Sequence, residues 1–132
     1  MEVLSSRVLL RPLDFERSLD FYVRQLGLSI YREYGYGGDV TGVVLFMGGG
    51  FLELSRSDGA APTKAGEGMR LWLQVPDLQA EFGRLEAAGV AILEPPAAMP
   101  WGLEEMWIED PDGNRVVLVE VPPAHPLRRR VD

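Results

Sequence analysis

The sequence has 132 residues, which is enough for one domain with a hydrophobic core and too few for two domains of ordinary size. Its formal charge of −7 disfavours nucleic acid as a partner, because binding to phosphates requires a basic surface. Cysteine is absent, which excludes disulfides, thiolate nucleophiles and cysteine-ligated metal sites.

The chain shows no sign of membrane insertion or export. No apolar run approaches the roughly 20 residues of a membrane helix, and residues 1–7 lack the layout of a signal peptide. We therefore expect a soluble, cytoplasmic protein that forms a single domain over residues 1–132. We interpret the basic residues 128–130 as a frayed terminus and assign them no function.

The first half of the chain predicts a strand, a helix and three further strands. Residues 7–10 form a short apolar strand, and Asp14 then caps a helix that runs to about Leu26 and ends at Gly27. Strands are predicted over residues 29–34, 42–47 and 51–55, with the glycine run 48–50 as a hairpin turn.

The second half repeats this order after a Gly-, Ala- and Pro-rich linker over residues 57–68. A strand begins at Arg70, Asp77 caps a helix that runs to about Ala88, and Gly89 ends that helix. Further strands are predicted over 90–93, 105–109 and 115–121, with the segment DPDGN (110–114) as a turn.

The two halves share one register, which indicates an internal duplication. The predicted fold class is α+β, with two tandem β-α-β-β-β modules over residues 5–56 and 69–122 and a tail over 123–132. We expect the modules to form a cupped eight-stranded mixed sheet, with the helices outside and a trough between the two halves.

Alternation along the strands predicts which side chains line that trough. The purely apolar faces should pack against the helices: Leu52, Leu54, Leu71, Leu73, Val75, Met106 and Ile108. The opposite faces should line the trough: Arg7, Leu9, Arg11, Phe51, Glu53, Ser55, Arg70, Trp72, Gln74, Glu105, Trp107, Glu109, Arg115, Val117 and Val119. Charged and large aromatic residues on one face indicate a ligand cleft or a dimer interface.

The duplicated modules, the segment LDFERSLDFY (13–22) with LGL (26–28), and the closing DPDGN turn resemble the vicinal oxygen chelate superfamily. This group includes glyoxalase I, extradiol dioxygenases, fosfomycin resistance enzymes and bleomycin resistance proteins. The resemblance covers roughly residues 7–121. It implies the fold and leaves the function open, because this fold hosts several chemistries.

Enzymes of the resembled family usually hold a divalent metal through a His on the first strand and a Glu on the last strand of each half. By register these positions are Arg7, Glu53, Arg70 and Val117. Only the glutamate is a metal-ligand type, and the single histidine, His125, lies in the Pro-rich tail. We therefore predict no metal and no other cofactor.

The two arginines could instead form an ion-pair cluster with Glu53. A purely structural network is the favoured interpretation of that cluster. The alternative is that the surplus arginine binds an anionic or carbonyl group of a ligand.

The segment PWG (100–102) and the strand that follows it resemble the bleomycin resistance proteins, which have the fold without a catalytic metal and sequester a drug. Aromatic faces beside carboxylates suit a planar, cationic ligand. The predicted ligand-binding residues are Trp72, Trp101, Trp107, Glu53, Arg7, Arg70, Phe51, Glu105 and Glu109. For the tryptophans, packing in a loop, in the core or in a dimer interface is the alternative.

These observations predict a metal-free protein that binds a small antibiotic or metabolite and acts by sequestration. The alternatives are a metal-dependent lyase, isomerase or dioxygenase of the same superfamily, and a dimeric interaction module. Whether the chain catalyses a reaction stays open at this point. We expect a homodimer, because the trough carries more apolar surface than a small chain usually leaves open.

Overall fold

The computed structural model describes residues 1–56 and 69–127. The chain forms two compact units, Met1–Ala65 and Gly66–Asp132. The division falls within the predicted linker 57–68, which lies outside the described residues, as do the basic residues 128–130.

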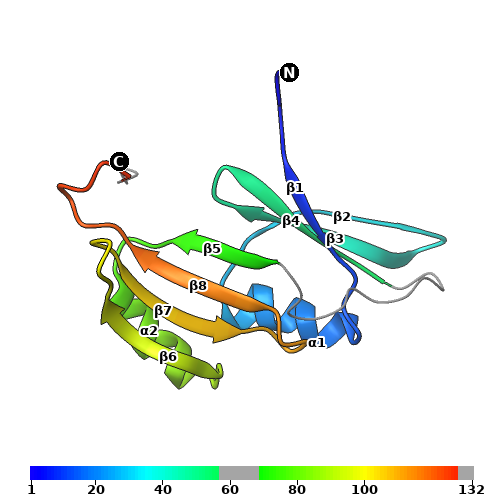
Figure 1. Ribbon diagram of the computed structural model, residues 1–132. Helices are drawn as coiled ribbons and strands as arrows, with labels where there is room; N and C mark the ends of the chain where they lie inside the picture. Colours follow the sequence, from blue (N-terminus) through cyan, green and yellow to red (C-terminus); the bar gives the residue numbers. More distant parts are fainter. Residues whose placement is uncertain (57–68, 128–132) are drawn as a thin grey trace. The chain divides into compact units, whose positions relative to one another are not determined.

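The first unit contains a four-stranded mixed sheet (Figure 1). Its elements are β1 (Arg7–Leu10), α1 (Phe15–Asp20), η1 (Phe21–Gln25), β2 (Ile30–Tyr36), β3 (Asp39–Met47) and β4 (Gly50–Ser55). The strand order is β1-β4-β3-β2, with β1 parallel to β4 and the other neighbours antiparallel. This order brings the first strand of the module next to its last strand.

The helical segment of the first unit begins and ends at the predicted residues. The Asp14 carboxylate accepts a hydrogen bond from the Arg17 amide at 3.1 Å, which satisfies one of the free N–H groups of the first turn. After α1 the chain continues as the π-helical turn η1, and Gly27 then adopts a φ of 89°. That left-handed conformation favours glycine, which explains why the helix ends here.

The second unit repeats this arrangement with its own four-stranded sheet. Its elements are β5 (Arg70–Gln74), α2 (Leu78–Ala87), β6 (Ile92–Ala98), β7 (Glu104–Glu109) and β8 (Arg115–Glu120). The strand order is β5-β8-β7-β6, with β5 parallel to β8 and the other neighbours antiparallel. The two units therefore have the same topology, strand for strand.

Helix α2 packs against β6, β7 and β8 (Figure 1). Asp77 caps it by accepting from the Ala80 amide at 3.0 Å, and Gly89 follows it with a φ of 78°. Glu120, at the end of β8, adds a second cap by accepting from the Leu78 amide at 2.8 Å. Strand parity predicts that Glu120 and Val117 point to opposite faces, and this contact places Glu120 on the helix side of the sheet.

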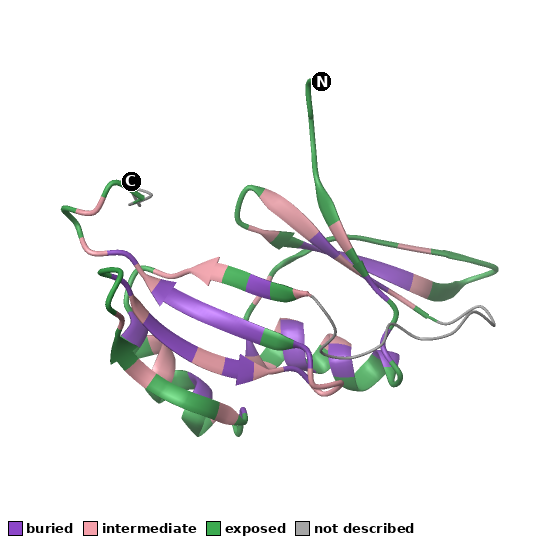
Figure 2. Ribbon diagram, viewed as in Figure 1, coloured by how far each residue is buried: buried purple, intermediate pink, exposed green. Residues whose placement is uncertain are grey.

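Most residues that alternation assigns to the helix-facing sides of the sheets are buried (Figure 2). In the first unit Leu52 and Leu54 are fully buried, together with Tyr22 of the helical segment. In the second unit Met106 and Ile108 are fully buried, and the middle four residues of the central strand β8 are buried as well. The helix-facing sides therefore agree with the sequence pattern, whereas Val117, Val119 and Glu105, which alternation assigns to the trough, are buried as well.

The turn before β8 is the predicted hairpin. The buried Asp110 carboxylate accepts hydrogen bonds from the backbone amides of Asp112 and Asn114 and from the Asn114 side chain, at 2.9, 2.8 and 2.9 Å. Gly113 has a φ of 83°, which this turn requires.

The predicted bounds of β6 and β3 need correction. The sequence predicts a strand over 90–93, whereas β6 spans Ile92–Ala98 and includes Pro95 and Pro96. These prolines are tolerated because β6 is an edge strand with register shifts, so their missing N–H groups break no central ladder. Strand β3 begins at Asp39, three residues earlier than predicted.

The predicted α+β fold class is confirmed: the described residues form two four-stranded mixed sheets with helices, arranged as two tandem β-α-β-β-β modules. The cupped sheet and the single domain over 1–132 remain predictions. Within residues 1–56 and 69–127, no helix is long and apolar enough to cross a membrane.

Candidate functional site

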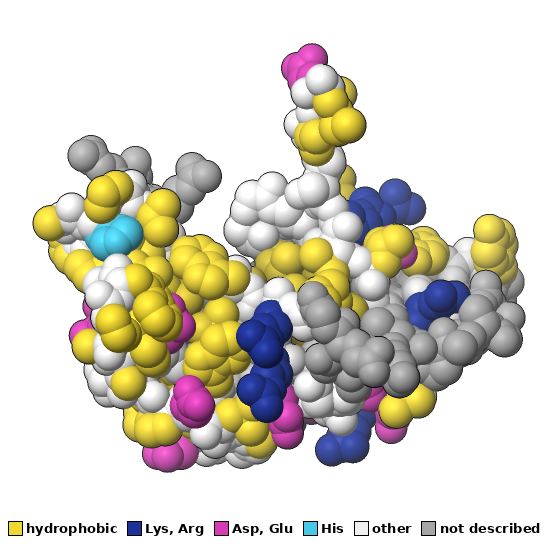
Figure 3. Space-filling view, in the orientation of Figure 1, with side chains coloured by type: hydrophobic (Ala, Val, Ile, Leu, Met, Phe, Trp, Pro, Cys, Tyr) yellow, Lys and Arg dark blue, Asp and Glu magenta, His cyan; other side chains and the backbone are white. Residues whose placement is uncertain are grey.

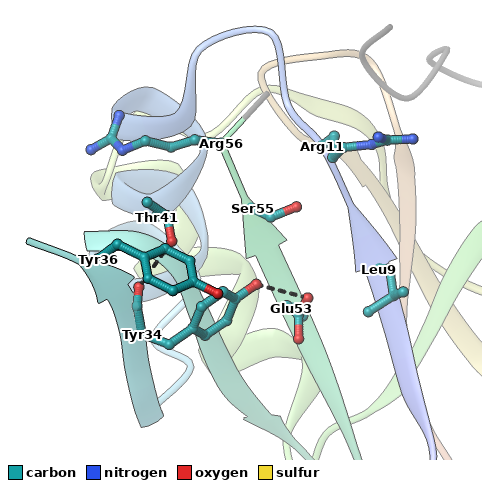
Figure 4. Close-up of a pocket in the computed structure, with 8 residues that line it drawn as sticks. All are labelled: Leu9, Arg11, Tyr34, Tyr36, Thr41, Glu53, Ser55 and Arg56. Carbon is teal, nitrogen blue, oxygen red and sulfur yellow. Dashed lines mark hydrogen bonds between the residues drawn. The ribbon is translucent and has the colours of Figure 1, made fainter. Parts of the chain in front are cut away.

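The first unit has a hollow of about 550 Å³ that is lined by residues of all four of its strands (Figure 4). Its walls carry aromatic, hydroxyl and charged groups, and the lining residues are Leu9, Arg11, Tyr34, Tyr36, Thr41, Glu53, Ser55 and Arg56. This volume lies within the range of about 300–1,000 Å³ that is common for small-molecule sites.

Glu53 is the centre of a hydrogen-bond network at the floor of this hollow. Arg7 donates to its Oε1 at 2.6 Å in an ion pair, and the Tyr34 hydroxyl donates to its Oε2 at 2.9 Å. Both carboxylate oxygens therefore already have a donor. The predicted pairing of Arg7 with Glu53 is confirmed, whereas Tyr34 was not predicted from the sequence.

Tyr34 is held in place by the strand next to it. It is the register partner of Gly42 in β3, and a Cβ at Gly42 would overlap the Tyr34 ring. The absence of a side chain at Gly42 therefore allows the ring to lie flat against the sheet. Burial raises the pKa of Tyr34 above its ordinary value, and the hydrogen bond to Glu53 and the charge of that carboxylate raise it further.

An aromatic cluster lies along the same sheet, formed by Tyr31, Phe46 and Phe51. Their ring centroids are 5.0 to 5.7 Å apart, and Tyr31 and Phe46 are about half exposed. The Arg7 guanidinium lies 5.9 Å from the centre of the Phe51 ring. Arg7 thus joins the carboxylate network to an apolar surface of the kind that binds planar molecules.

Arg56 lines the hollow at the end of β4, and its contacts fix it there. It donates to the Val40 carbonyl at 2.9 Å and forms an ion pair with Glu16, and its guanidinium lies 4.2 Å from the centre of the Phe15 ring. We assign Arg56 a structural role in attaching the helix to the sheet.

The second unit has a hollow of its own, of about 480 Å³. It is lined by Arg70, Leu93, Glu94, Trp107 and Arg115. The Arg70 guanidinium lies 5.6 Å from the centre of the Trp107 ring, and Trp107 packs on the buried cluster of Leu103, Val117, Val119 and Val121. Two of the predicted ligand-binding residues, Arg70 and Trp107, are therefore together here.

The remaining predicted residues of the second unit divide into paired and exposed side chains. The Trp101 indole donates to the Glu105 carboxylate at 2.6 Å, and Glu105 is buried. Trp72 is half exposed, and Glu109 is partly exposed at the end of β7. The predicted place of Arg70 beside Glu53, which lies in the other unit, stays a prediction.

The hydrophobic surface of the two units is visible in Figure 3, where yellow side chains reach the surface of each. Large exposed hydrophobic residues include Leu9, Tyr36 and Phe46 in the first unit and Trp72, Leu93 and Trp101 in the second. Such side chains on strands and loops are available to a ligand or to a second protein chain.

The residues at the family's metal-ligand positions do not fit a divalent metal. Arg7 and Arg70 have no lone pair to donate, Val117 is buried and apolar, and both Glu53 oxygens already accept hydrogen bonds. Among the described residues, no group of three or more His, Asp or Glu side chains is placed to hold a metal ion.

Comparison with known proteins agrees with this fold. A probable lactoylglutathione lyase of Vibrio cholerae is 28% identical over 131 residues, covering 89% of this chain and 90% of that protein. The structure of TnmS3, an antibiotic binding protein from Streptomyces sp. CB03234, is similar with a TM-score of 0.71 and 26% identity, covering 92% of this chain and 98% of that one.

A glyoxalase/bleomycin resistance protein/dioxygenase superfamily member from Sphaerobacter thermophilus is similar with a TM-score of 0.72 and 29% identity, covering 90% of this chain and 98% of that one. The family model described as the glyoxalase/bleomycin resistance protein/dioxygenase superfamily matches residues 5–118, which include both modules. The chain therefore belongs to the glyoxalase/bleomycin resistance protein/dioxygenase superfamily.

Proposed function

We propose that this protein binds a small aromatic organic molecule without a metal ion and acts by sequestering it. The observation that carries this proposal is the state of Glu53. It is the one carboxylate at the family's metal-ligand positions, and Arg7 and Tyr34 already engage both of its oxygens beside an open hollow.

The network has a physical consequence for a metal. A divalent cation at Glu53 would compete with Arg7 and Tyr34 for the carboxylate, and its charge would lie close to a guanidinium that never deprotonates. Two unit charges of like sign at about 4 Å repel by roughly 4 kcal/mol at an effective dielectric near 20, and a divalent ion doubles that cost. Glu53 is also the only ligand-type side chain at these four positions, and one carboxylate falls short of the three or four protein ligands that transition-metal sites use.

The walls of the hollows suit a planar organic ligand. We propose that ligands contact the predicted residues that are open to solvent or line a hollow, together with two tyrosines of the first unit: Arg7, Phe51, Glu53, Arg70, Trp72, Trp101, Trp107, Glu109, Tyr34 and Tyr36. Aromatic contacts with a ligand ring each contribute on the order of 1 kcal/mol. The likeness to TnmS3, an antibiotic binding protein, supports a ligand of this kind.

The second candidate function is a metal-dependent lyase, isomerase or dioxygenase of the same superfamily. The observation in its favour is the 28% identity to a probable lactoylglutathione lyase over most of both chains. It requires a metal held by residues other than those at the expected register. A bound metal together with an activity that a chelator abolishes would select it.

We also propose that the protein is a cytoplasmic homodimer. The support for a dimer is the number of large side chains left exposed, such as Phe46 and Trp72, which are 45% and 49% exposed. In such a dimer, each chain could bind a ligand in the hollow of its first unit or in the hollow of its second unit.

A thermal-shift screen of antibiotics and aromatic metabolites tests the binding function. A ligand that binds only the folded state raises the melting temperature, by an amount that grows with its concentration. We expect the same shift with EDTA and with added zinc or manganese. We also expect the bound compound to be recovered chemically unchanged after the protein is denatured.

Two variants make the screen specific to the site. Tyr34→Phe removes the hydroxyl that donates to Glu53, and Arg84→Gln changes an exposed arginine of α2 outside both hollows. A ligand of the first unit should lose shift with the former and keep it with the latter. Hits that require a metal, or that are recovered as converted products, would contradict sequestration.

A further inference from the structure

The internal duplication allows the two halves of this protein to be compared position by position. In the first unit Arg7 is the register partner of Phe51, and Leu9 is the partner of Glu53. In the second unit Arg70 is the partner of Arg115, and Trp72 is the partner of Val117. The second unit therefore has an arginine where the first has Phe51 and a valine where the first has Glu53.

This difference changes the charge of the second hollow. Arg7 has an ion-pair partner at 2.6 Å, whereas Arg70 and Arg115 form no ion pair with any residue in the described part of the chain. Directly opposed like charges on neighbouring strands destabilise a sheet. The two guanidiniums are exposed and line the same hollow, so an anion placed between them would relieve their repulsion.

The other residues that line this hollow are apolar, except for Glu94, whose charge offsets only one of the two arginines. Leu93 is 39% exposed, and Trp107 is held against a buried cluster. Glu94 also lines the hollow, so two arginines and one glutamate leave one net positive charge among the lining residues. Glu109 is the register partner of Arg115, but no ion pair joins them in this structure.

We infer that the second unit carries a binding site for a planar aromatic carboxylate, with its carboxylate between Arg70 and Arg115 and its ring against Trp107 and Leu93. This inference rests on the proposed small-molecule binding and names the ligand's charge. It replaces the cationic ligand expected from the sequence, because Glu105, one of the carboxylates predicted to contact the ligand, is buried and accepts a hydrogen bond from the Trp101 indole.

Three matched probes of one shape test the inference: naphthalene-2-carboxylate, its neutral carboxamide and the cationic 2-naphthylmethylamine. Isothermal titration calorimetry on the full chain should give the carboxylate at least about tenfold tighter binding than the amide, since hydrogen bonds to charged groups are the stronger ones. The preference should shrink as sodium chloride is raised, because salt screens exposed charges.

Variants then assign the preference to the two arginines. Arg115→Phe restores the pattern of the first unit, and we expect it to remove most of the carboxylate preference while the amide binds as before. Arg70→Gln should do the same, Arg115→Lys should retain much of the preference, and Arg84→Gln on α2 should have no effect. Val117→Glu supplies the counterion of the first unit and should also remove the preference. Because Val117 is buried, Arg115→Phe is the decisive variant.

The outcomes separate this inference from the proposed function. Equal affinity for the three probes, tightest binding of the amine, or no binding by any of them would overturn the anion site. Binding of other compounds in the thermal-shift screen would still support sequestration in that case. A retained carboxylate preference together with metal-dependent conversion of a bound compound would overturn sequestration and leave the anion site standing.

Discussion

The hydrogen bond from Tyr34 to Glu53 can be tested by removing one oxygen atom. Tyr34→Phe deletes the hydroxyl, which donates to the carboxylate at 2.9 Å, and keeps the ring against the sheet. A hydrogen bond to a charged group contributes about 1.5–3 kcal/mol to stability. Since the Glu53 side chain is still 16% exposed, we expect a loss of about 1.5–2 kcal/mol, toward the lower end of that range.

The ion pair should contribute less. The Arg7 side chain is 39% exposed, so water screens its charge, and we expect Arg7→Gln to cost about 1 kcal/mol or less. The two substitutions act on one carboxylate, so the cost of the double variant should differ from the sum of the single costs by about 0.5 kcal/mol or more.

Urea denaturation followed by far-ultraviolet circular dichroism is the appropriate assay. All three tryptophans lie in the second unit and all four tyrosines in the first, so tryptophan emission would report on the wrong part of the chain. Tyr36→Phe is the matched control, because Tyr36 lines the same hollow but is 87% exposed. Equal stability of the Tyr34→Phe and Tyr36→Phe proteins would refute the network.

Three further predictions concern titration, the hairpin turn and assembly. The raised pKa of Tyr34 means that folding favours the neutral phenol, so its stabilising contribution is complete below the ordinary tyrosine pKa and is lost as pH rises through the higher folded pKa. When tyrosinate absorbance is followed as the pH is raised, one tyrosine should ionise at a higher pH than the others, and Tyr34→Phe should remove that step. If the step persists in the variant, the raised pKa does not belong to Tyr34. Asp110→Ala should lower the free energy of unfolding by about 2–4 kcal/mol, because three donors lose their buried acceptor. Unfolding followed by tryptophan emission measures this loss, and a loss below about 1 kcal/mol would contradict the turn geometry. Sedimentation at tens of micromolar should show a dimer, and a monomer would count against the proposed pairing.

Much of the fold could be predicted because its signals are local. A helix cap such as Asp14 or Asp77 needs only an aspartate before an apolar periodic segment, and the left-handed Gly27 and Gly89 follow from the same segments. Alternation then assigns Leu52 and Glu53 to opposite faces of β4. The repeat supplies the remaining information, since each module supports the interpretation of the other.

The role of Tyr34 could not be predicted for a physical reason. Strand β2 has register shifts between Ile30 and Arg32 and between Tyr34 and Gly35, and each shift breaks the period-2 rule. The partner of Tyr34 also lies two strands away in the sheet, on β4. The one available signal was Gly42, a glycine inside a strand, which often marks the close approach of another group.

The pairing of Trp101 with Glu105 shows a second limit. Sequence reasoning placed Glu105 on the open face as a charge for the ligand, because alternation along β7 gives only the direction of a side chain. The contact depends on how the loop before β7 folds back, and Gly102 in that loop has a φ of 89°. Loop geometry of this kind is set by tertiary packing and leaves little trace in the pattern of residues.

The central claim of this account is that the protein binds its ligand without a metal. Elemental analysis of the full chain, purified without chelators and then exposed to zinc, nickel, manganese and iron before dialysis, tests it most directly. We predict that no transition metal remains at a stoichiometric level, because Glu53 is engaged by Arg7 and Tyr34. Retention of one transition-metal ion per chain that is lost in the Glu53→Gln variant would contradict the account.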